Sequence, residues 1–348
     1  MPLHVFDDEE SVNSMTRAPE QSISIENELL ESTEKAILKI KLIKESLGRI
    51  IFGQEEVIEQ VLVTVLSGGH GLLVGLPGLA KTKLVESLGV TLGLAQQRIQ
   101  FTPDLMPADI IGSEILEETQ DKSRVFRFIK GPIFGQLIMA DEINRASPRT
   151  QSALLQAMQE HHVTVAGHHY ALPTPFHVLA TQNPLEQEGT YPLPEAQLDR
   201  FLMQINVSYP DLESERRILI ETTGEKSLTA TNCVSGDELP SIQRLVRQLP
   251  VGDRIVDAIL HLIRSARPGE GQKDISRHIA WGPGPRGAQS LMLAARARAL
   301  LTGRLSPTIQ DVAILALPVL RHRMALTASS RRDISIEEII RNLVNRIE

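Results

Sequence analysis

The first strong pattern along the chain is a pair of amphipathic helices. From about residue 25 large apolar side chains recur close to every 3.6 residues, which predicts a helix; they are Leu29, Leu30, Ile37, Ile40, Ile43 and Leu47. A second helix is predicted because Val57, Val61 and Val65 share one face. A Ser-Gly-Gly run at 67–69 is expected to end it.

The pattern then changes to short apolar runs separated by helical segments. Helices are predicted at 81–88 and 150–160. Continuous apolar runs are typical of strands buried on both faces of a sheet, and they lie at 71–74, 137–140, 177–180 and 201–205. Because strands alternate with helices, we predict an α/β fold with a mainly parallel sheet between helices.

From residue 241 onward only helical periodicity is present. Pro318 is expected to end the fourth of five predicted helices, which span 242–249, 254–266, 289–301, 308–317 and 336–347. We therefore predict a small all-α domain at 241–348, preceded by an α/β core at 25–215 and a polar linker at 216–240. Residues 1–24, rich in Ser, Glu and Asp, are predicted to form a disordered acidic tail.

Composition narrows the class of protein. Hydrophobic residues make up 42% and charged residues 23% of the 348 residues, which is typical of a globular chain and excludes collagen and coiled coils. No apolar run reaches the roughly 18 residues of a membrane span, and the acidic N-terminus does not resemble a secretory signal. The single cysteine, Cys233, cannot form an internal disulfide, which predicts a reducing, cytoplasmic setting.

The two parts of the chain differ in charge. The net charge is −7, yet residues 241–348 hold 17 Lys and Arg against 9 Asp and Glu, so they carry +8 and residues 1–240 carry −15. Two interpretations stay open. An Arg-rich surface can bind nucleic acid, or basic and acidic faces of neighbouring subunits can meet.

A phosphate-binding loop is predicted between the first strand and its helix. Lys81 would reach the β- and γ-phosphates, and the Thr82 hydroxyl would hold Mg²⁺. The backbone N–H groups of a P-loop and the N-terminus of its helix face phosphate oxygens. Ala80 occupies the position of the second glycine of the usual pattern, and an ordinary Gly/Pro turn is the alternative. The predicted nucleotide-binding residues here are Gly75, Leu76, Pro77, Gly78, Leu79, Ala80, Lys81, Thr82 and Lys83.

Polar side chains follow the next two strands. Asp141 and Glu142 come directly after the apolar run at 137–140, at the strand edge where ligands bind in open α/β sheets. Asp141 would hold Mg²⁺ through water, and Glu142 would polarise the attacking water. Asn183 follows the run at 177–180, and its amide could hydrogen-bond both the γ-phosphate and that water. A solvated strand end and an Asn-Pro turn are the alternatives.

The order of these motifs resembles Walker A, Walker B and sensor 1 of AAA+ ATPases. Over about residues 45–345 the chain more closely resembles the MoxR family; the segments that carry the resemblance are RIQFTPDLMPADI (98–110), DEINRA (141–146), QSALLQAMQE (151–160), ATQNP (180–184) and LPEAQLDRF (193–201). The resemblance implies an AAA+ P-loop NTPase core, a C-terminal helical lid, ATP or ADP, and Mg²⁺.

Further roles follow from this resemblance. Arg200 is similar to the arginine finger that enters the nucleotide site of a neighbouring subunit, although it could simply pair with Asp199 or Glu195 at a helix end. Arg286 resembles sensor 2, which would touch the γ-phosphate of its own subunit; an Arg in a Gly/Pro turn is the alternative. Gly53 and Gln54 resemble the segment along the adenine, or form a plain helix start.

Two insertions also fit the MoxR resemblance. Residues 105–135 are expected to form the extra element within the second helix of this clade. Alternation and a glycine turn predict a hairpin at 163–172, which is either structural or a client contact. Four histidines of this region invite a metal-site interpretation, which is weak because adjacent strand residues point to opposite faces; they are His161, His162, His168 and His169.

The resemblance implies a function as well as a fold. MoxR proteins resemble chaperones that remodel, mature or activate partner proteins with Mg-ATP, including metal or cofactor insertion, and their partners often carry von Willebrand A-type domains. We expect a homo-oligomeric ring, a hexamer, and no nucleic-acid partner. The main alternative is a nucleic-acid-linked AAA+ motor or regulator, against which the net charge of −7 argues. A slow nucleotide switch is a third alternative, against which Glu142, Asn183 and Arg200 argue.

Overall fold

The computed structural model describes residues 17–118, 124–186, 188–224, 228–271 and 273–347. Its first helix, α1 (Arg17–Gly48), begins eight residues before the apolar periodicity does, so residues 17–24 are helical and not part of a tail. The periodicity missed them because it counts only large apolar residues. The remainder of the predicted tail, residues 1–16, lies outside the described residues.

A parallel five-stranded sheet forms the centre of the molecule. Its strand order is β2-β5-β8-β1-β9, and every neighbouring pair is parallel. All five strands therefore end at the same edge, which is where the sequence predicts the functional side chains. The strands are β1 (Gly71–Gly75), β2 (Gln96–Gln100), β5 (Leu137–Asp141), β8 (His177–Gln182) and β9 (Met203–Val207).

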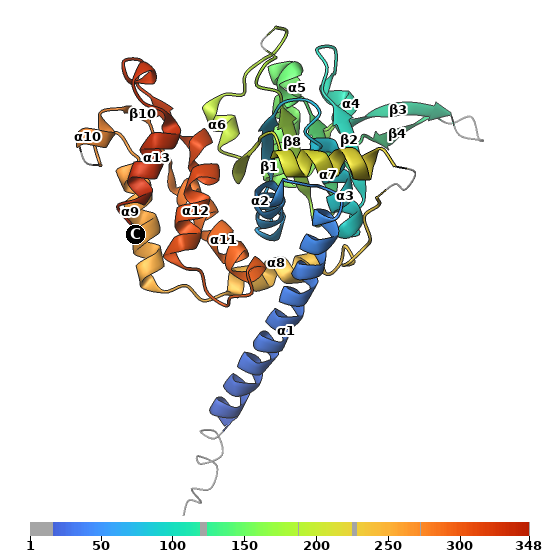
Figure 1. Ribbon diagram of the computed structural model, residues 1–348. Helices are drawn as coiled ribbons and strands as arrows, with labels where there is room; N and C mark the ends of the chain where they lie inside the picture. Colours follow the sequence, from blue (N-terminus) through green and yellow to red (C-terminus); the bar gives the residue numbers. More distant parts are fainter. Residues whose placement is uncertain (1–16, 119–123, 187, 225–227, 272, 348) are drawn as a thin grey trace, which may run out of the picture.

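Successive side chains of each central strand enter two different apolar cores. Leu73 and Met139 pack with α1, α2 (Glu55–Leu66) and α3 (Lys81–Thr91), whereas Leu72 and Ile138 pack with α5 (Pro148–Glu160). This alternation follows from the two-residue period of a strand and explains the continuous apolar runs of the sequence. The result is the predicted α/β core, with helices on both faces of the sheet (Figure 1).

The C-terminal part is helical, as predicted, with two differences. The α-helices described in this part are α8 (Leu239–Gln248), α9 (Asp253–Ser265), α10 (Lys273–Ser276), α11 (Pro285–Leu301), α12 (Ile309–Leu320) and α13 (Ile336–Val344). A short antiparallel pair, β10 (Ile279–Trp281) and β11 (Ala325–Leu326), is added to the expected all-α domain. Pro318 lies inside α12 and does not end it, because in the last turn a proline removes only one helical hydrogen bond and α12 is held by its buried side chains.

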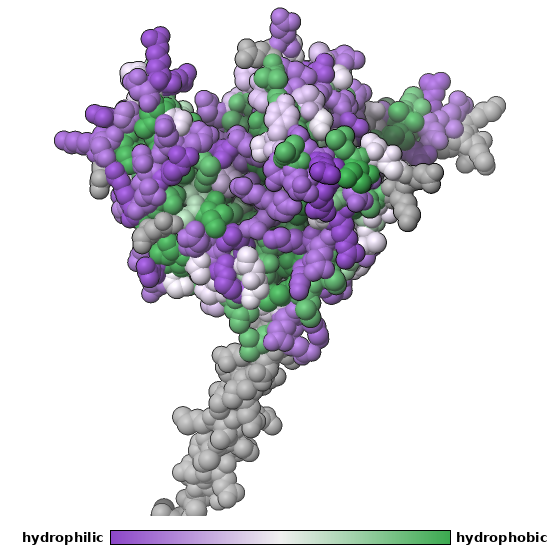
Figure 2. Space-filling view, viewed as in Figure 1, coloured by the Kyte–Doolittle hydropathy of each residue, from purple (hydrophilic) through white to green (hydrophobic). Residues whose placement is uncertain are grey.

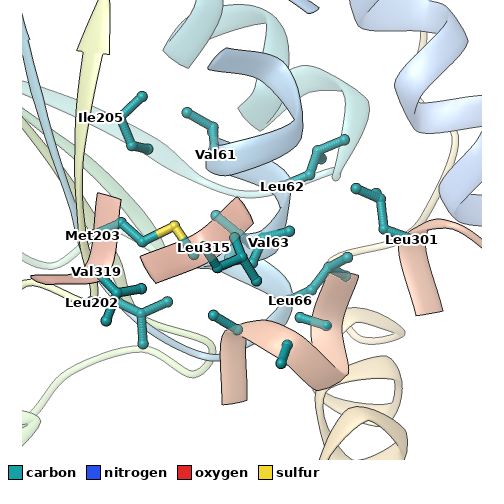
Figure 3. Packing of buried hydrophobic residues seen from close by; sticks show 14 of the residues in the cluster. Val61, Leu62, Val63, Leu66, Leu202, Met203, Ile205, Leu301, Leu315 and Val319 are labelled. Carbon is teal, nitrogen blue, oxygen red and sulfur yellow. The ribbon is translucent and has the colours of Figure 1, made fainter. Parts of the chain in front are cut away.

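The lid packs directly against the α/β core. One cluster of buried apolar side chains is continuous across this junction. Val61, Leu62 and Leu66 of α2 share one apolar cluster with Met203 and Ile205 of β9 and with Leu315 and Val319 of the lid (Figure 3). The predicted linker at 216–240 is partly helical, since α7 (Leu212–Thr222) occupies its first residues. This helix was not predicted because it buries no residue and so shows no clear apolar period.

Two antiparallel hairpins extend from the core. The predicted insertion at 105–135 contains α4 (Pro107–Ile111) and the hairpin of β3 (Gly112–Glu118) with β4 (Arg124–Lys130). The predicted hairpin at 163–172 is present as β6 (His162–Val165) and β7 (His168–Ala171). Phe128 stacks on Tyr170 with ring centroids 4.0 Å apart, so the two hairpins support each other. In the part of the chain that the structure describes, no helix combines the length and apolarity needed to cross a bilayer.

Candidate nucleotide site

The predicted phosphate loop connects β1 to α3. Gly78 and Ala80 both have left-handed backbones, with φ of 81° and 57°, which curl the loop around its own N–H groups. The curl therefore forms without a glycine at 80, at a cost of roughly 1–2 kcal/mol for an L-residue. Gly75 is required for a different reason, because a Cβ there would lie 2.6 Å from the carbonyl oxygen of Val207.

Lys81, the first residue of α3, folds back over this loop. Its Nζ donates hydrogen bonds to the carbonyl oxygens of Gly75 and, at 2.8 Å, Leu76. Burial lowers the pKa of Lys81, and the negative charges of Asp141 and Glu142 oppose that shift. The ammonium group thus lies in the field of the acidic pair, as a phosphate-binding lysine beside a Walker B pair requires. Thr82 follows it in the first turn of α3.

Asp141, the last residue of β5, is held by two neighbouring strands. Its Oδ1 accepts a 2.6 Å hydrogen bond from the Thr181 hydroxyl of β8, and its Oδ2 accepts one of 2.5 Å from Arg98 of β2. Thr181 also accepts from the Glu142 backbone N–H at 2.9 Å. These contacts fix the orientation of the carboxylate. No sequence pattern assigned a role to Arg98 or Thr181, although the order of the strands brings them to the acidic pair.

Glu142 leaves β5 in a left-handed conformation, with φ of 55°. Its Oε2 accepts hydrogen bonds from Gln100 Nε2 at 2.8 Å and from Arg145 at 2.9 Å. Arg145 is matched to this carboxylate, since its pKa is raised by the hydrogen bond and charge of Glu142. Among the described residues Oε1 has no partner, so one oxygen stays available to a water molecule.

Asn183 lies one residue beyond β8, between the ends of β5 and β1. Its side chain is 8% exposed, and its Oδ1 accepts a hydrogen bond from the Leu185 backbone N–H at 3.1 Å. This turn leaves the amide N–H₂ group as the free end of the side chain. Strand order therefore brings together four predicted site residues at one edge of the sheet, namely Lys81, Asp141, Glu142 and Asn183.

A cavity of about 430 Å³ opens beside the loop. Predicted residues on its lining are Gln54, Gly78, Leu79, Ala80 and Lys83. Apolar side chains from before α2 and from α7 complete it, including Phe52 and Ile218. A mostly apolar slot next to a phosphate loop suits a nucleotide base. The α7 residues were missed because they fell in the predicted linker.

The segment before α2 is fixed tightly at this cavity. Gln54 is buried and donates from Nε2 to the Ser208 carbonyl oxygen at 2.8 Å. Gly53 has φ of 68°, and a Cβ there would lie 2.5 Å from the Cβ of Ser214, so this position needs glycine. The guanidinium of Arg217 lies 4.6 Å from the Phe52 ring and shields that ring from solvent.

Arg200 lies at the opposite end of the sheet. It precedes β9, whose residues Met203 and Val207 pair in parallel with Gly71 and Gly75 of β1. Arg200 therefore lies at the amino end of the sheet, whereas the phosphate loop lies at the carboxyl end. A five-residue strand separates the two ends by about 16 Å. Arg200 instead lines a groove along α5 with Gln156 and Gln197, among others.

Arg286, in the first turn of α11, lies beside Asp199 and not beside the loop. Its guanidinium is 3.4 Å from Asp199 Oδ2, and Asp199 directly precedes Arg200. The resemblance implied that Arg286 would touch the γ-phosphate of its own subunit. The structure does not bring Arg286 to that phosphate loop. The reason is that the lid docks against the amino end of β9, through contacts such as His322 Nε2 to the Phe201 carbonyl oxygen at 3.1 Å.

The histidines of the β6–β7 hairpin form side-chain contacts with one another. The rings of His162 and His169 are 4.9 Å apart and edge-to-face, and His162 Nδ1 lies 3.0 Å from the Glu160 carbonyl oxygen. Within the described part of the chain, no group of three or more His, Cys, Asp or Glu is arranged to hold a metal ion. The metal-site interpretation therefore gains no support from this geometry.

Known protein families match both parts of the chain. Residues 70–203 match the "ATPase family associated with various cellular activities (AAA)", and residues 272–343 match the AAA lid domain. A crystal structure of a candidate ATPase from Cytophaga hutchinsonii superposes with a TM-score of 0.85 and 37% identity, covering 92% of this chain and 98% of that one. These matches agree with the α/β core and helical lid described above.

Two of three relatives that match most of this chain carry the name MoxR. Chaperone MoxR1 of Mycobacterium tuberculosis is 42% identical over 317 residues, which cover 90% of this chain and 81% of that protein. Protein MoxR of Paracoccus denitrificans is 32% identical over 316 residues, covering 85% and 91%. YeaC of Bacillus subtilis, whose function is uncharacterised, is 39% identical and covers 87% and 92%. With the loop, the acidic pair and the lid in place, this chain belongs to the MoxR family of AAA+ ATPases.

Proposed function

We propose that this protein hydrolyses ATP with Mg²⁺ in a homo-oligomeric ring and uses the energy to remodel, mature or activate a partner protein. One observation carries the proposal. The loop and acidic pair lie at one end of the sheet, and Arg200 lies at the other, beyond the reach of its own loop. A complete site therefore needs two subunits.

Residues of the carboxyl end fit a magnesium nucleotide. Thr82 offers a hydroxyl and Asp141 a carboxylate whose direction is fixed by Thr181, and hard oxygen donors of this kind suit Mg²⁺, which keeps several of its waters. When bound, Mg²⁺ neutralises charge on the β- and γ-phosphates. Lys81 exchanges its bonds to the loop carbonyls for phosphate oxygens, and the apolar cavity holds the base.

Hydrolysis is assigned to Glu142 and Asn183. Glu142 Oε1 accepts a proton from the attacking water, while Oε2 stays with Gln100 and Arg145. The Asn183 amide group donates to the γ-phosphate or to that water, since its Oδ1 is occupied by the Leu185 N–H. Arg200 and Arg286 of the next subunit stabilise the charge that develops on the transferred phosphoryl group.

Surface properties support a head-to-tail ring. Residues 241–348 carry +8 and residues 1–240 carry −15, so basic and acidic faces of successive subunits can meet. Apolar side chains are among those exposed over α7, beside the nucleotide cavity (Figure 2). Leu212, Leu219 and Ile220 are 64–83% exposed there, and a neighbouring subunit would cover them. We take the ring to be a hexamer.

The client is proposed to be a protein. MoxR1 is named a chaperone, and von Willebrand A-type partners and metal or cofactor insertion remain part of the proposal as implied by the family. The cytoplasmic setting stays a prediction. The alternative, a nucleic-acid motor, is opposed by the net charge of −7.

The test combines turnover with capture. Glu142→Gln is expected to bind ATP but to hydrolyse it at least about 10²-fold more slowly, because a general base is removed. Purified from its native cells with ATP and Mg²⁺, this variant should retain a protein that the matched Lys81→Ala control does not. Near-normal turnover of Glu142→Gln would overturn the assignment of the base, and retention of nucleic acid lost on nuclease treatment would favour the motor.

A further inference from the structure

Arg323 of the lid is a fully buried arginine with an unusual number of partners. It ends η2 (Arg321–Arg323), the turn after α12, and only 1% of its side chain is exposed. A buried guanidinium is costly unless its N–H groups are all satisfied. Its contacts therefore show what the position is built to hold.

Those contacts converge on the segment that carries Arg200. The Nε of Arg323 donates to Asp199 Oδ1 at 2.7 Å. One terminal nitrogen donates to the carbonyl oxygens of Asp199 at 3.2 Å and Phe201 at 2.7 Å, and the other donates to that of Leu202 at 3.1 Å. Arg323 thus binds the backbone on both sides of Arg200. These carbonyls follow the four-residue helix α6 (Glu195–Leu198), whose own hydrogen bonds cannot satisfy them.

The same guanidinium is anchored in the lid. It donates to the Val319 carbonyl oxygen of α12 at 2.5 Å and to the Ser290 hydroxyl of α11 at 3.2 Å. Val319 and Leu202 lie close together in the apolar junction around these bonds (Figure 3). The lid and the Arg200 segment are therefore joined rigidly at this point.

Arg200 itself lacks such restraints. Its backbone N–H donates to the Gln197 carbonyl oxygen at 3.2 Å, but among the described residues its side chain has no hydrogen-bond or ion-pair partner. The direction of the side chain is then set by the backbone of 199–202. Asp199 shares its second oxygen with Arg286, so the same bonds also place that arginine.

We propose that Arg323 is a positioning residue for the arginine finger: from the lid it sets the backbone that aims Arg200, and through Asp199 also Arg286, at the nucleotide of the neighbouring subunit. This inference rests on the proposed role of Arg200. It adds that the lid of one subunit controls hydrolysis in the next, through a residue that touches no nucleotide.

The experiment is a double-mutant cycle in the full-length protein. Arg323→Lys keeps a cation for Asp199 but cannot bind the three carbonyls together. We expect turnover to fall about 10- to 100-fold, as for a misplaced catalytic group, while affinity for ATP stays within about twofold. In an Arg200→Ala background, the same change should lower turnover by less than about twofold, because there is no finger left to aim.

Arg298→Lys is the matched control. Arg298 is another poorly exposed lid arginine that binds the core, at 2.9 Å from Glu59, and it also binds Asp311, but it does not touch the Arg200 segment. We expect a loss of stability with turnover within about twofold. Turnover losses of similar size for Arg298→Lys and Arg323→Lys would show a general lid effect and overturn the inference.

The remaining outcomes separate the inference from the proposed function. Equal losses from Arg323→Lys with and without Arg200 would refute positioning while leaving the finger intact. Unchanged turnover in Arg200→Ala alone would refute the proposed finger itself. Should Arg323→Lys fail to fold, Asp199→Asn keeps the size of the carboxylate and the backbone bonds, and the same cycle with Arg200→Ala decides.

Discussion

Both ends of the parallel sheet carry polar side chains, but those at the carboxyl end have hydrogen-bonding atoms available to a ligand, whereas buried ones at the amino end have none. At the carboxyl end, Lys81 donates to loop carbonyl oxygens that phosphate oxygens can replace. Glu142 is bonded through Oε2, which leaves Oε1 without a partner among the described residues. At the amino end, His70 donates to the Met158 carbonyl oxygen and accepts from the Val178 N–H, so both ring nitrogens are satisfied. His177 likewise donates to the Gly69 carbonyl oxygen and accepts from Gln243.

The difference teaches how to separate chemistry from structure in one sheet. A buried polar group whose every hydrogen bond ends on its own chain contributes to stability and has nothing left for a ligand. A half-buried group with a spare atom is available for binding. Arg200 belongs to the second kind although it lies at the amino end, which is why we assign it to a neighbour's site.

The largest effect is expected from Lys81→Ala. Loss of the charge-assisted bonds to two phosphates should weaken ATP binding by about 10²-fold or more, since each is worth roughly 1.5–3 kcal/mol. The midpoint of thermal unfolding without nucleotide should hardly change, because Lys81 binds only loop carbonyls. Titration calorimetry with ATP measures this, and retained tight binding would refute the phosphate-loop assignment.

Acidification from pH 7 to 5 should act through buried, neutral histidines, namely His70 and His177 at the amino end and His322 of the lid, whose pKa burial likewise lowers. Burial lowers the pKa of His70 to about 3 and that of His177 to about 4, both below the usual 6.5. Between each lowered pKa and 6.5, the unfolded chain binds more protons than the folded protein does. The stabilisation from keeping these rings neutral is therefore complete above pH 6.5 and is lost as the pH falls. From pH 7 to 5 we expect the free energy of unfolding to drop by roughly 2 kcal/mol per histidine.

Denaturant titrations across this pH range measure the effect. The Asp311 carboxylate cannot account for it. Its burial is outweighed by bonds to Arg304, Arg298 and Thr308, which lower its pKa to about 2, so its stabilisation is lost only below about pH 4. A flat profile between pH 7 and 5 would show that these histidines are not buried and neutral.

His70→Ala is the next largest change. It removes two buried hydrogen bonds and leaves a cavity beside Phe176, which should cost roughly 2–4 kcal/mol. Thermal unfolding of the purified variant measures the loss. Affinity for ATP should stay within about twofold where the variant is folded, and a larger change would mean that the two ends of the sheet are coupled.

The smallest change is expected from Gln243→Ala in α8. Its amide donates to the Val65 carbonyl oxygen at 2.8 Å and lies 3.0 Å from His177 Nε2. Losing these bonds should cost about 1 kcal/mol of stability. It should also remove part of the acid sensitivity, because His177 Nε2 becomes free to bind a proton. An unchanged pH profile would contradict the assignment of Nε2 of His177 as the acceptor of the Gln243 hydrogen bond.

The sequence predicted the carboxyl end well because that end is local. Each candidate side chain lies shortly after its own apolar strand, so Lys81, Asp141 and Asn183 could be placed by position alone. The parallel sheet then brought them together. The hairpin at 162–171 was found for the same reason, since alternation and a turn lie within ten residues of each other.

The amino end and the lid junction could not be predicted, because they depend on contacts between distant residues. Arg323 binds Asp199, which lies 124 positions earlier, and nothing in the Arg-His-Arg run at 321–323 indicates that partner. The docking of Arg286 beside Asp199 was likewise hidden. Helix α7 was missed because it buries no side chain and has no strong apolar period.

The left-handed backbone at Ala80 has a consequence for how this loop can vary. What the turn demands at position 80 is a dihedral angle, and the choice of amino acid is secondary. Glycine meets the demand without strain but enlarges the conformational freedom of the unfolded chain, whereas alanine does the reverse. The strain at alanine, roughly 1–2 kcal/mol, exceeds the roughly 0.4–1 kcal/mol that alanine gains by restricting the unfolded chain. Ala80→Gly is therefore expected to stabilise the protein slightly, by about 1 kcal/mol or less, because the loop requires a backbone shape that glycine adopts without strain.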